Sequence, residues 1–130
     1  MDAQPRRRAS ELSRADVPEC PGVYAWYRRG RVVYVGEGDD LRDRVWTRHM
    51  GQGKSLHTSA FRRNVAESLG LGAANEIFKK ANRLTDEQRA LVGAWVVSCS
   101  VAWIECKSIV AAEKLEDDMK AEWRPPLTKV

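Results

Sequence analysis

Two tyrosines and an arginine in the first third of the chain have the types and spacing of residues that could act on a phosphate group. Tyr24 and Tyr34 stand in short runs of β-branched and aromatic residues, which favour β-strands, and nine residues separate them. Arg44 follows ten residues after Tyr34, on a helix that Asp39 or Asp40 could cap. Because a guanidinium matches phosphate oxygens, two phenols and Arg44 could converge on one small phosphate-binding site.

Each of these residues also has an ordinary structural explanation. Tyrosines in strands usually pack against neighbouring side chains, and an arginine on a helix is most often solvated or paired with an acid such as Asp40. Only together with Arg44 and with Glu116 of the last helix, described below, do the two tyrosines favour the chemical interpretation.

The segment between the tyrosines is typical of a β-hairpin. The two strands are expected over Val23–Tyr27 and Val32–Val35. Gly30 can adopt the positive φ angle that a tight hairpin turn requires. If the loop is centred on Arg29, the two tyrosines lie directly opposite one another, on the same face of the hairpin.

A glutamate on the predicted last helix occupies an unusual position. Ser108 is expected to cap this helix, which ends before Pro125. An apolar stripe at helical spacing consists of Ile109, Ala112, Met119 and Trp123. Glu116 falls inside the stripe, whereas Glu113, Glu122 and Asp117 can reach water. Since burying an unpaired carboxylate is costly, Glu116 is expected to meet a metal ion or a cationic partner.

The segments Gly22-Val23-Tyr24 and Tyr34-Val35-Gly36 resemble the motif of the GIY-YIG nuclease domain family. That family pairs Gly-Ile-Tyr with Tyr-Ile-Gly, followed by an arginine on the next helix and a glutamate on a late helix. Arg44 and Glu116 stand at the matching places here, and the resemblance covers residues 21–50 and 108–128. It implies an α+β fold with a small three-stranded antiparallel sheet flanked by helices.

The resemblance also implies an activity, the metal-dependent hydrolysis of DNA phosphodiester bonds by an endonuclease that uses Mg²⁺ or Mn²⁺. The implied catalytic residues are Tyr24, Tyr34, Arg44 and Glu116, with Glu116 as the metal ligand. Tyr24 would deprotonate or orient the attacking water, and Tyr34 would position it. A free phenol has a pKa of about 10, so Tyr24 needs positive charge nearby, from Arg44, Arg48 or the metal.

Five residues are candidates for accessory roles in catalysis. They stand at or near positions where the family has further characteristic residues and this chain has different ones. The family often has a lysine just after the second glycine, or a histidine one helical turn after the arginine. Glu37 and Arg48 occupy those positions here. We interpret His49 and His57 as polar surface residues, of which His57 is the better candidate because of its loop. Thr128 stands where the family usually has asparagine.

Composition and charge are compatible with a nucleic acid partner but do not establish one. The 130-residue chain has a formal net charge of +4, and its sequence pI is about 9.1. A phosphate-tracking surface is expected from Arg42, Arg48, Lys54, Arg62 and Arg63. The three cysteines lack the spacing of a metal site or a disulfide framework. With neither a signal segment nor a bilayer-spanning run in the sequence, a cytoplasmic location is expected.

The expected organisation is a flexible basic arm over residues 1–16 followed by a single domain over residues 17–130. A helical insert at about 54–100 contains a helix to Leu69 and another that begins with the capping signature at Thr85. A third strand is expected over Val101–Cys106. The sequence offers no obvious second DNA-binding domain, so the insert, a protein partner or a homo-oligomer would supply specificity.

Two alternatives to an active nuclease remain. One is a catalytically impaired nucleic-acid-binding module of the same fold, and the other is a protein-interaction domain. Salt separates them, because binding to a phosphate backbone weakens steeply with salt concentration and binding through an apolar protein interface does not.

Overall fold

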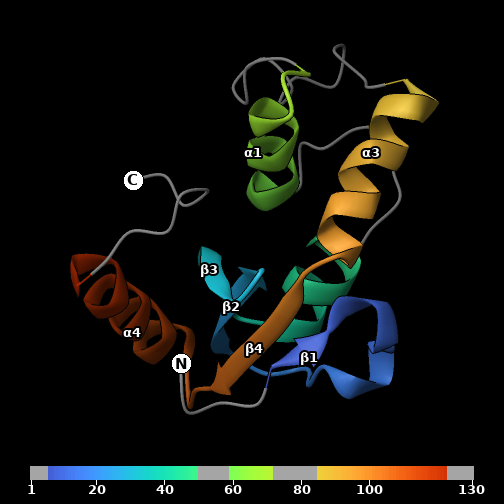
Figure 1. The fold of residues 1–130 in the computed structure, drawn as a ribbon. Helices are drawn as coiled ribbons and strands as arrows, with labels where there is room; N and C mark the ends of the chain where they lie inside the picture. Colours follow the sequence, from blue (N-terminus) through green and yellow to red (C-terminus); the bar gives the residue numbers. More distant parts are fainter. Residues whose placement is uncertain (1–5, 50–58, 72–84, 123–130) are drawn as a thin grey trace.

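The two tyrosine-bearing runs form an antiparallel hairpin, β2 (Gly22–Arg28) and β3 (Arg31–Gly38). The computed structural model describes residues 6–49, 59–71 and 85–122 (Figure 1). Arg29 and Gly30 both have positive φ angles, of 54° and 77°, as a two-residue turn of the mirror-image type requires.

The hairpin register differs from the one centred on Arg29. The turn contains two residues, and the register shifts again between Trp26 and Tyr27, so Tyr34 pairs with Trp26 and Gly36 pairs with Tyr24. Residues two apart on a strand point to the same face. The two tyrosines therefore share a face but stand diagonally rather than directly opposite.

The sheet has four antiparallel strands, one more than the resemblance implies. β4 (Ser100–Glu105) pairs with β2, close to the predicted third strand, and β1 (Arg7–Arg8) pairs with β4. The order is β1-β4-β2-β3, which leaves β3 and its tyrosine at one edge of the sheet.

The segment expected to be a flexible basic arm differs from that expectation over residues 6–16. After β1 come two short 3₁₀ helices, η1 (Ala9–Glu11) and η2 (Arg14–Asp16). The backbone amide of Ala9 donates to the carbonyl of Cys99 over 2.9 Å, and the side chains of Ala9 and Leu12 lie in the core. Burial of these apolar side chains, together with the pairing of β1 with β4, holds the segment against the domain.

The two faces of the sheet carry different layers (Figure 1). Tyr24 and Trp26 belong to a core cluster shared with α1 (Ala60–Ser68), α3 (Asp86–Val97) and the helix that follows the hairpin. Val23 and Ala25, on the opposite face, pack with Ala112 of α4 (Ile109–Glu122). Strand alternation thus gives both faces a buried layer.

The helices begin where the sequence predicts. The Ser59 side chain caps α1, Thr85 and Gln88 form the predicted capping box of α3, and the Ser108 hydroxyl accepts the amide of Ala111. In the described ranges no helix is long and apolar enough to cross a membrane. The expected bounds of the single domain and of its insert at about 54–100 stay a prediction.

The helix after the hairpin, η3 (Arg42–His49), is a π-helix rather than the expected α-helix. Its backbone hydrogen bonds join residues five apart. The wider turn brings the side chain of His49, five residues after Arg44, nearer to the side of Arg44 than an α-helix would.

Candidate active site

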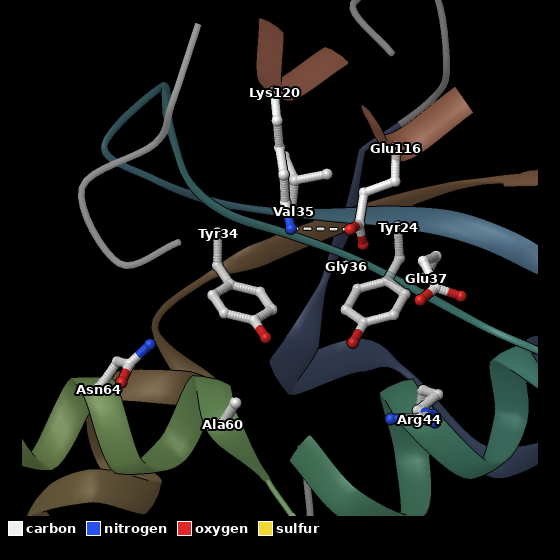
Figure 2. Close-up of a pocket in the computed structure, with 10 residues that line it drawn as sticks. All are labelled: Tyr24, Tyr34, Val35, Gly36, Glu37, Arg44, Ala60, Asn64, Glu116 and Lys120. Carbon is white, nitrogen blue, oxygen red and sulfur yellow. Dashed lines mark ion pairs between the residues drawn. The ribbon is translucent and has the colours of Figure 1, made fainter. Parts of the chain in front are cut away.

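Five elements meet at a cavity of about 240 Å³ at the β3 edge of the sheet (Figure 2). Its walls come from β2, β3, η3, α1 and α4. The lining residues are Tyr24, Tyr34, Val35, Gly36, Glu37, Arg44, Ala60, Asn64, Glu116 and Lys120. The four residues predicted to be catalytic, Tyr24, Tyr34, Arg44 and Glu116, all stand in this set.

The two tyrosine rings lie side by side in the cavity wall. Their centroids are 6.4 Å apart with an interplanar angle of 26°. In the view of Figure 2, Glu116 and Lys120 lie on one side of the rings and Arg44 lies on the other. In this view the two phenols thus stand between the Glu116–Lys120 ion pair and the guanidinium of Arg44.

The glycines of the motif leave room for these side chains. A Cβ atom built on Gly36 would collide with the phenol of Tyr24, and one on Gly38 would collide with the side chain of Arg44. Both positions therefore favour glycine for the space it leaves beside functional groups.

Burial makes both phenols poor acids. It raises the pKa of Tyr24 well above its usual value, an effect that Tyr34 reinforces and Arg44 opposes. Burial, followed by the nearby Glu116 carboxylate, raises the pKa of Tyr34 to about 12. Neither phenol is ionised near neutral pH, so Tyr24 needs a partner that can receive its proton.

His49 is that partner, which corrects its assignment to the surface. Only 3% of the residue is exposed, and its Nε2 atom lies 2.6 Å from the Tyr24 hydroxyl. The sequence argument counted one α-helical turn from Arg44 and arrived at Arg48, whereas the π-helix brings the residue five after Arg44 to the same side. Nothing in the local sequence reveals the wider turn.

The Arg44 side chain presents an unsatisfied donor. Its Nε atom is buried, and within the described residues neither a hydrogen-bond acceptor nor an ion-pair partner is found for this guanidinium, Asp40 included. A buried N–H group without an acceptor costs roughly 1–3 kcal/mol. Arg44 also lines the cavity, so an anion bound there could pair with its guanidinium.

Glu116 has the buried position that the apolar stripe predicts, with 9% of the residue exposed. One of its oxygens, Oε1, lies 2.7 Å from Nζ of Lys120, one turn later on α4. Glu113 and Asp117 are exposed, as predicted. The expected cationic partner is thus present within the chain.

Glu37 adds a second carboxylate to the cavity, between Glu116 and Arg44 in the view of Figure 2. Its pKa is raised by burial and then by the charge of Glu116. In the part of the chain that is described, no cluster of three or more histidine, cysteine, aspartate or glutamate side chains could hold a metal ion. A cation here would have two carboxylates at most, together with water and ligand oxygens.

The site also contains a residue that sequence reasoning missed. Asn64 of α1 lines the cavity and lies below Tyr34 in the view of Figure 2. It lies three residues after Phe61 on a helix that the sequence assigned to an insert. The only available signal was a polar residue beside the apolar stripe of that helix.

The predicted phosphate-tracking surface is corrected in part. Arg62 is 2% exposed, and burial, together with the charge of Arg89, lowers its pKa to about 10. Arg42 donates to the carbonyl of Val17 over 2.8 Å and pairs with Glu19. Such buried or engaged guanidinium groups do not form an open binding surface. Arg63 is half-buried, and burial lowers its pKa.

The remaining expectations lie outside what the structure describes. Lys54, His57 and Thr128 are not among the described residues, and the position of the Arg48 side chain is not described either. Their predicted roles stay predictions.

Comparison with known proteins supports the resemblance noted in the motif. No protein-family model matches the chain. The UvrABC system protein C of Thermus thermophilus is 41% identical over 64 residues, which are 49% of this chain and 10% of that protein. The chain thus spans about a tenth of the length of this relative.

Solved structures similar to the chain include the GIY-YIG N-terminal endonuclease domain of UvrC from Thermotoga maritima. A point mutant of that domain bound to its catalytic divalent cation is 17% identical, with a TM-score of 0.47, and 88% of each chain is covered. The magnesium-bound domain is 19% identical with a TM-score of 0.43 and the same coverage. The sequence match to UvrC over about half of the chain agrees with the resemblance that the motif predicts.

Proposed function

We propose that this chain is a metal-dependent endonuclease domain that hydrolyses phosphodiester bonds of DNA. The observation that carries the proposal is the convergence of Tyr24, Tyr34, Arg44 and Glu116 on one cavity, with the Tyr24 hydroxyl bonded to a buried imidazole. A buried phenol needs a hydrogen-bond partner in any role, but an imidazole is a partner that can also take its proton.

The donor atoms in the cavity fit a hard divalent cation such as Mg²⁺ or Mn²⁺. Glu116 would hold it, with Glu37 as the second carboxylate, and Mg²⁺ is commonly bound by one or two carboxylates plus water and phosphate oxygens. The ammonium group of Lys120 already occupies the place of a cation beside Glu116. A bound divalent ion would add positive charge against the phosphate oxygens.

Tyr24 and His49 would move the proton of the attacking water. As water attacks phosphorus, one of its O–H bonds breaks and the proton joins the Tyr24 oxygen. The original phenolic proton passes to Nε2 of His49, which becomes an imidazolium. The 2.6 Å separation of these two atoms permits this transfer without movement of either side chain.

Arg44 and Asn64 would bind the phosphate. The Arg44 guanidinium would direct its unsatisfied N–H toward a phosphoryl oxygen, where negative charge grows in the transition state. Asn64 would provide the amide that the family supplies from a C-terminal asparagine, the position that Thr128 occupies here. Tyr34, beside Tyr24, would position the water.

A second candidate function is a nucleic-acid-binding module without turnover. The Glu116–Lys120 ion pair favours it, because the ammonium group of Lys120 competes with a metal cation for the carboxylate. A protein partner or homo-oligomer that supplies specificity, and a cytoplasmic location, are further parts of the proposal and stay predictions.

Incubation of the purified chain with labelled branched, nicked and duplex DNA, with Mg²⁺, Mn²⁺ or EDTA, tests the proposal. We expect cleavage with either metal and none with EDTA, and loss of cleavage in Tyr24→Phe. Salt-sensitive DNA binding with no cleavage under any metal condition would leave the binding module as the function. DNA binding that does not weaken as the salt concentration rises would favour the protein-interaction domain.

A further inference from the structure

Three buried polar groups form a continuous chain from the cavity to the start of α1. The Tyr24 hydroxyl lies 2.6 Å from Nε2 of His49, and Nδ1 of the same ring lies 2.6 Å from Oγ of Ser59. All three residues are buried, with 2%, 3% and 1% exposed. In such a chain the position of one proton fixes the positions of the others.

Ser59 is held in place by the helix that it caps. Its Oγ atom accepts the backbone N–H of Arg62 over 3.1 Å, and the helix is anchored by the fully buried Phe61 and Val65. The oxygen is therefore a fixed acceptor whose position depends on the packing of α1 and not on the cavity.

A neutral His49 ring has two tautomers, and each is compatible with both hydrogen bonds. Either Tyr24 donates to Nε2 and Nδ1–H donates to Ser59, or Ser59 donates to Nδ1 and Nε2–H donates to Tyr24. A phenol is a stronger donor than an aliphatic hydroxyl, and this favours the first arrangement. The serine oxygen can accommodate it, because it has a second lone pair for Nδ1–H beside the one that accepts the backbone N–H of Arg62.

We propose that Ser59 is the positioning residue of this site, because its oxygen accepts the Nδ1–H of His49 and so keeps Nε2 free to take the proton of Tyr24. The inference rests on the proposed nuclease function. When the proton moves, the imidazolium keeps a partner at each nitrogen, Ser59 at Nδ1 and Tyr24 at Nε2. In the opposite tautomer Nε2 already carries a proton and cannot take another.

The tautomer of His49 can be measured directly on the whole chain. The chain has two histidines, so the variant His57→Gln, labelled with ¹⁵N-histidine, gives NMR signals from His49 alone. At a pH where the ring is neutral we expect the protonated, pyrrole-type signal from Nδ1 and the pyridine-type signal from Nε2. A pyrrole-type signal from Nε2 would overturn the proposal.

Variants of Ser59 separate positioning from helix capping. Ser59→Ala is expected to lower kcat by about 10- to 100-fold, the range seen when a group that orients a reacting side chain is lost, with the KM for DNA unchanged. It should also give a mixture of tautomers. Ser59→Asp retains the cap and can only accept, so it should keep the Nδ1–H tautomer and most of kcat.

Thr85→Ala is the matched control, since it removes the cap of α3 without touching His49. It should lower the urea midpoint about as much as Ser59→Ala does and leave kcat unchanged. If Thr85→Ala lowers kcat equally, or Ser59→Ala leaves both tautomer and kcat unchanged, Ser59 is a helix cap and nothing more.

The measurements also separate this inference from the proposed function. A chain that never cleaves DNA refutes the nuclease proposal, and the spectrum of His49 still reports how Ser59 is bonded. A chain that cleaves DNA while His49 shows the opposite tautomer refutes the role of Ser59 alone.

Discussion

Replacement of Arg44 by alanine should strongly slow cleavage and leave the fold almost as stable as before. Loss of a guanidinium that meets growing phosphoryl charge should lower kcat by about 10²–10³-fold, or about 2.7–4 kcal/mol of transition-state stabilisation. The cleavage assay with Mg²⁺ at saturating DNA measures this change.

The small effect on stability follows from two opposing contributions. Truncation of Arg44 removes partly buried methylene groups, and each buried methylene stabilises by about 0.8 kcal/mol, so the loss is about 1 kcal/mol for a side chain that remains partly exposed. Truncation also removes the buried Nε–H, whose missing acceptor costs about 1–3 kcal/mol. The two contributions nearly cancel or leave the variant slightly stabilised.

Urea unfolding of the wild type and of Arg44→Ala checks the second half of the prediction. Arg31→Ala, at an exposed position at the start of β3, is the matched control and should change neither stability nor kcat. If Arg44→Ala loses about 3 kcal/mol or more of unfolding free energy, as for a broken buried ion pair, and still cleaves DNA, Arg44 is structural and the reasoning fails.

Three further predictions concern charge in the cavity. Glu116→Gln should abolish metal binding measured by calorimetry in the presence of a non-cleavable DNA, whereas the exposed Glu113→Gln should not; equal loss in both would remove Glu116 as the ligand. Lys120→Met should tighten metal binding by roughly 2- to 5-fold, because a partly exposed ion pair worth about 0.5–1 kcal/mol no longer competes for the Glu116 carboxylate. An unchanged metal affinity would show that Lys120 does not compete with the metal. The free energy of unfolding should fall as pH rises from about 10 to about 12, because the pKa of Tyr34 is higher in the folded chain than in the unfolded chain. Urea titrations of Tyr34→Phe should show a smaller fall. An identical fall in the variant would contradict the raised pKa.

The N-terminal segment shows where local sequence patterns fail. A run of arginines with few apolar residues predicts a solvated arm, yet Arg7 and Arg8 pair with β4 and Leu12 enters the core. The apolar side chains of Ala9 and Leu12 stabilise the segment because they are buried against elements that are distant in the sequence. The local sequence does not show which elements will cover them.

The sequence by itself determined the hairpin, the tyrosines on one face and the burial of Glu116. These features follow from spacings of two, three and four residues, which encode the faces of strands and helices directly. Even the capping signature at Thr85 is local, since the donor and the acceptor lie three residues apart.

Only the tertiary structure decided which side chains form the hydrogen-bonded chain that begins at the Tyr24 hydroxyl. The π-helix brings His49, five residues after Arg44, against the phenol, and the packing of α1 brings Ser59 against the imidazole. Asn64 and Lys120 enter the cavity through the same packing. Such contacts join groups on separate elements, and their geometry depends on helix type and packing to within an ångström, which spacing along a chain does not encode.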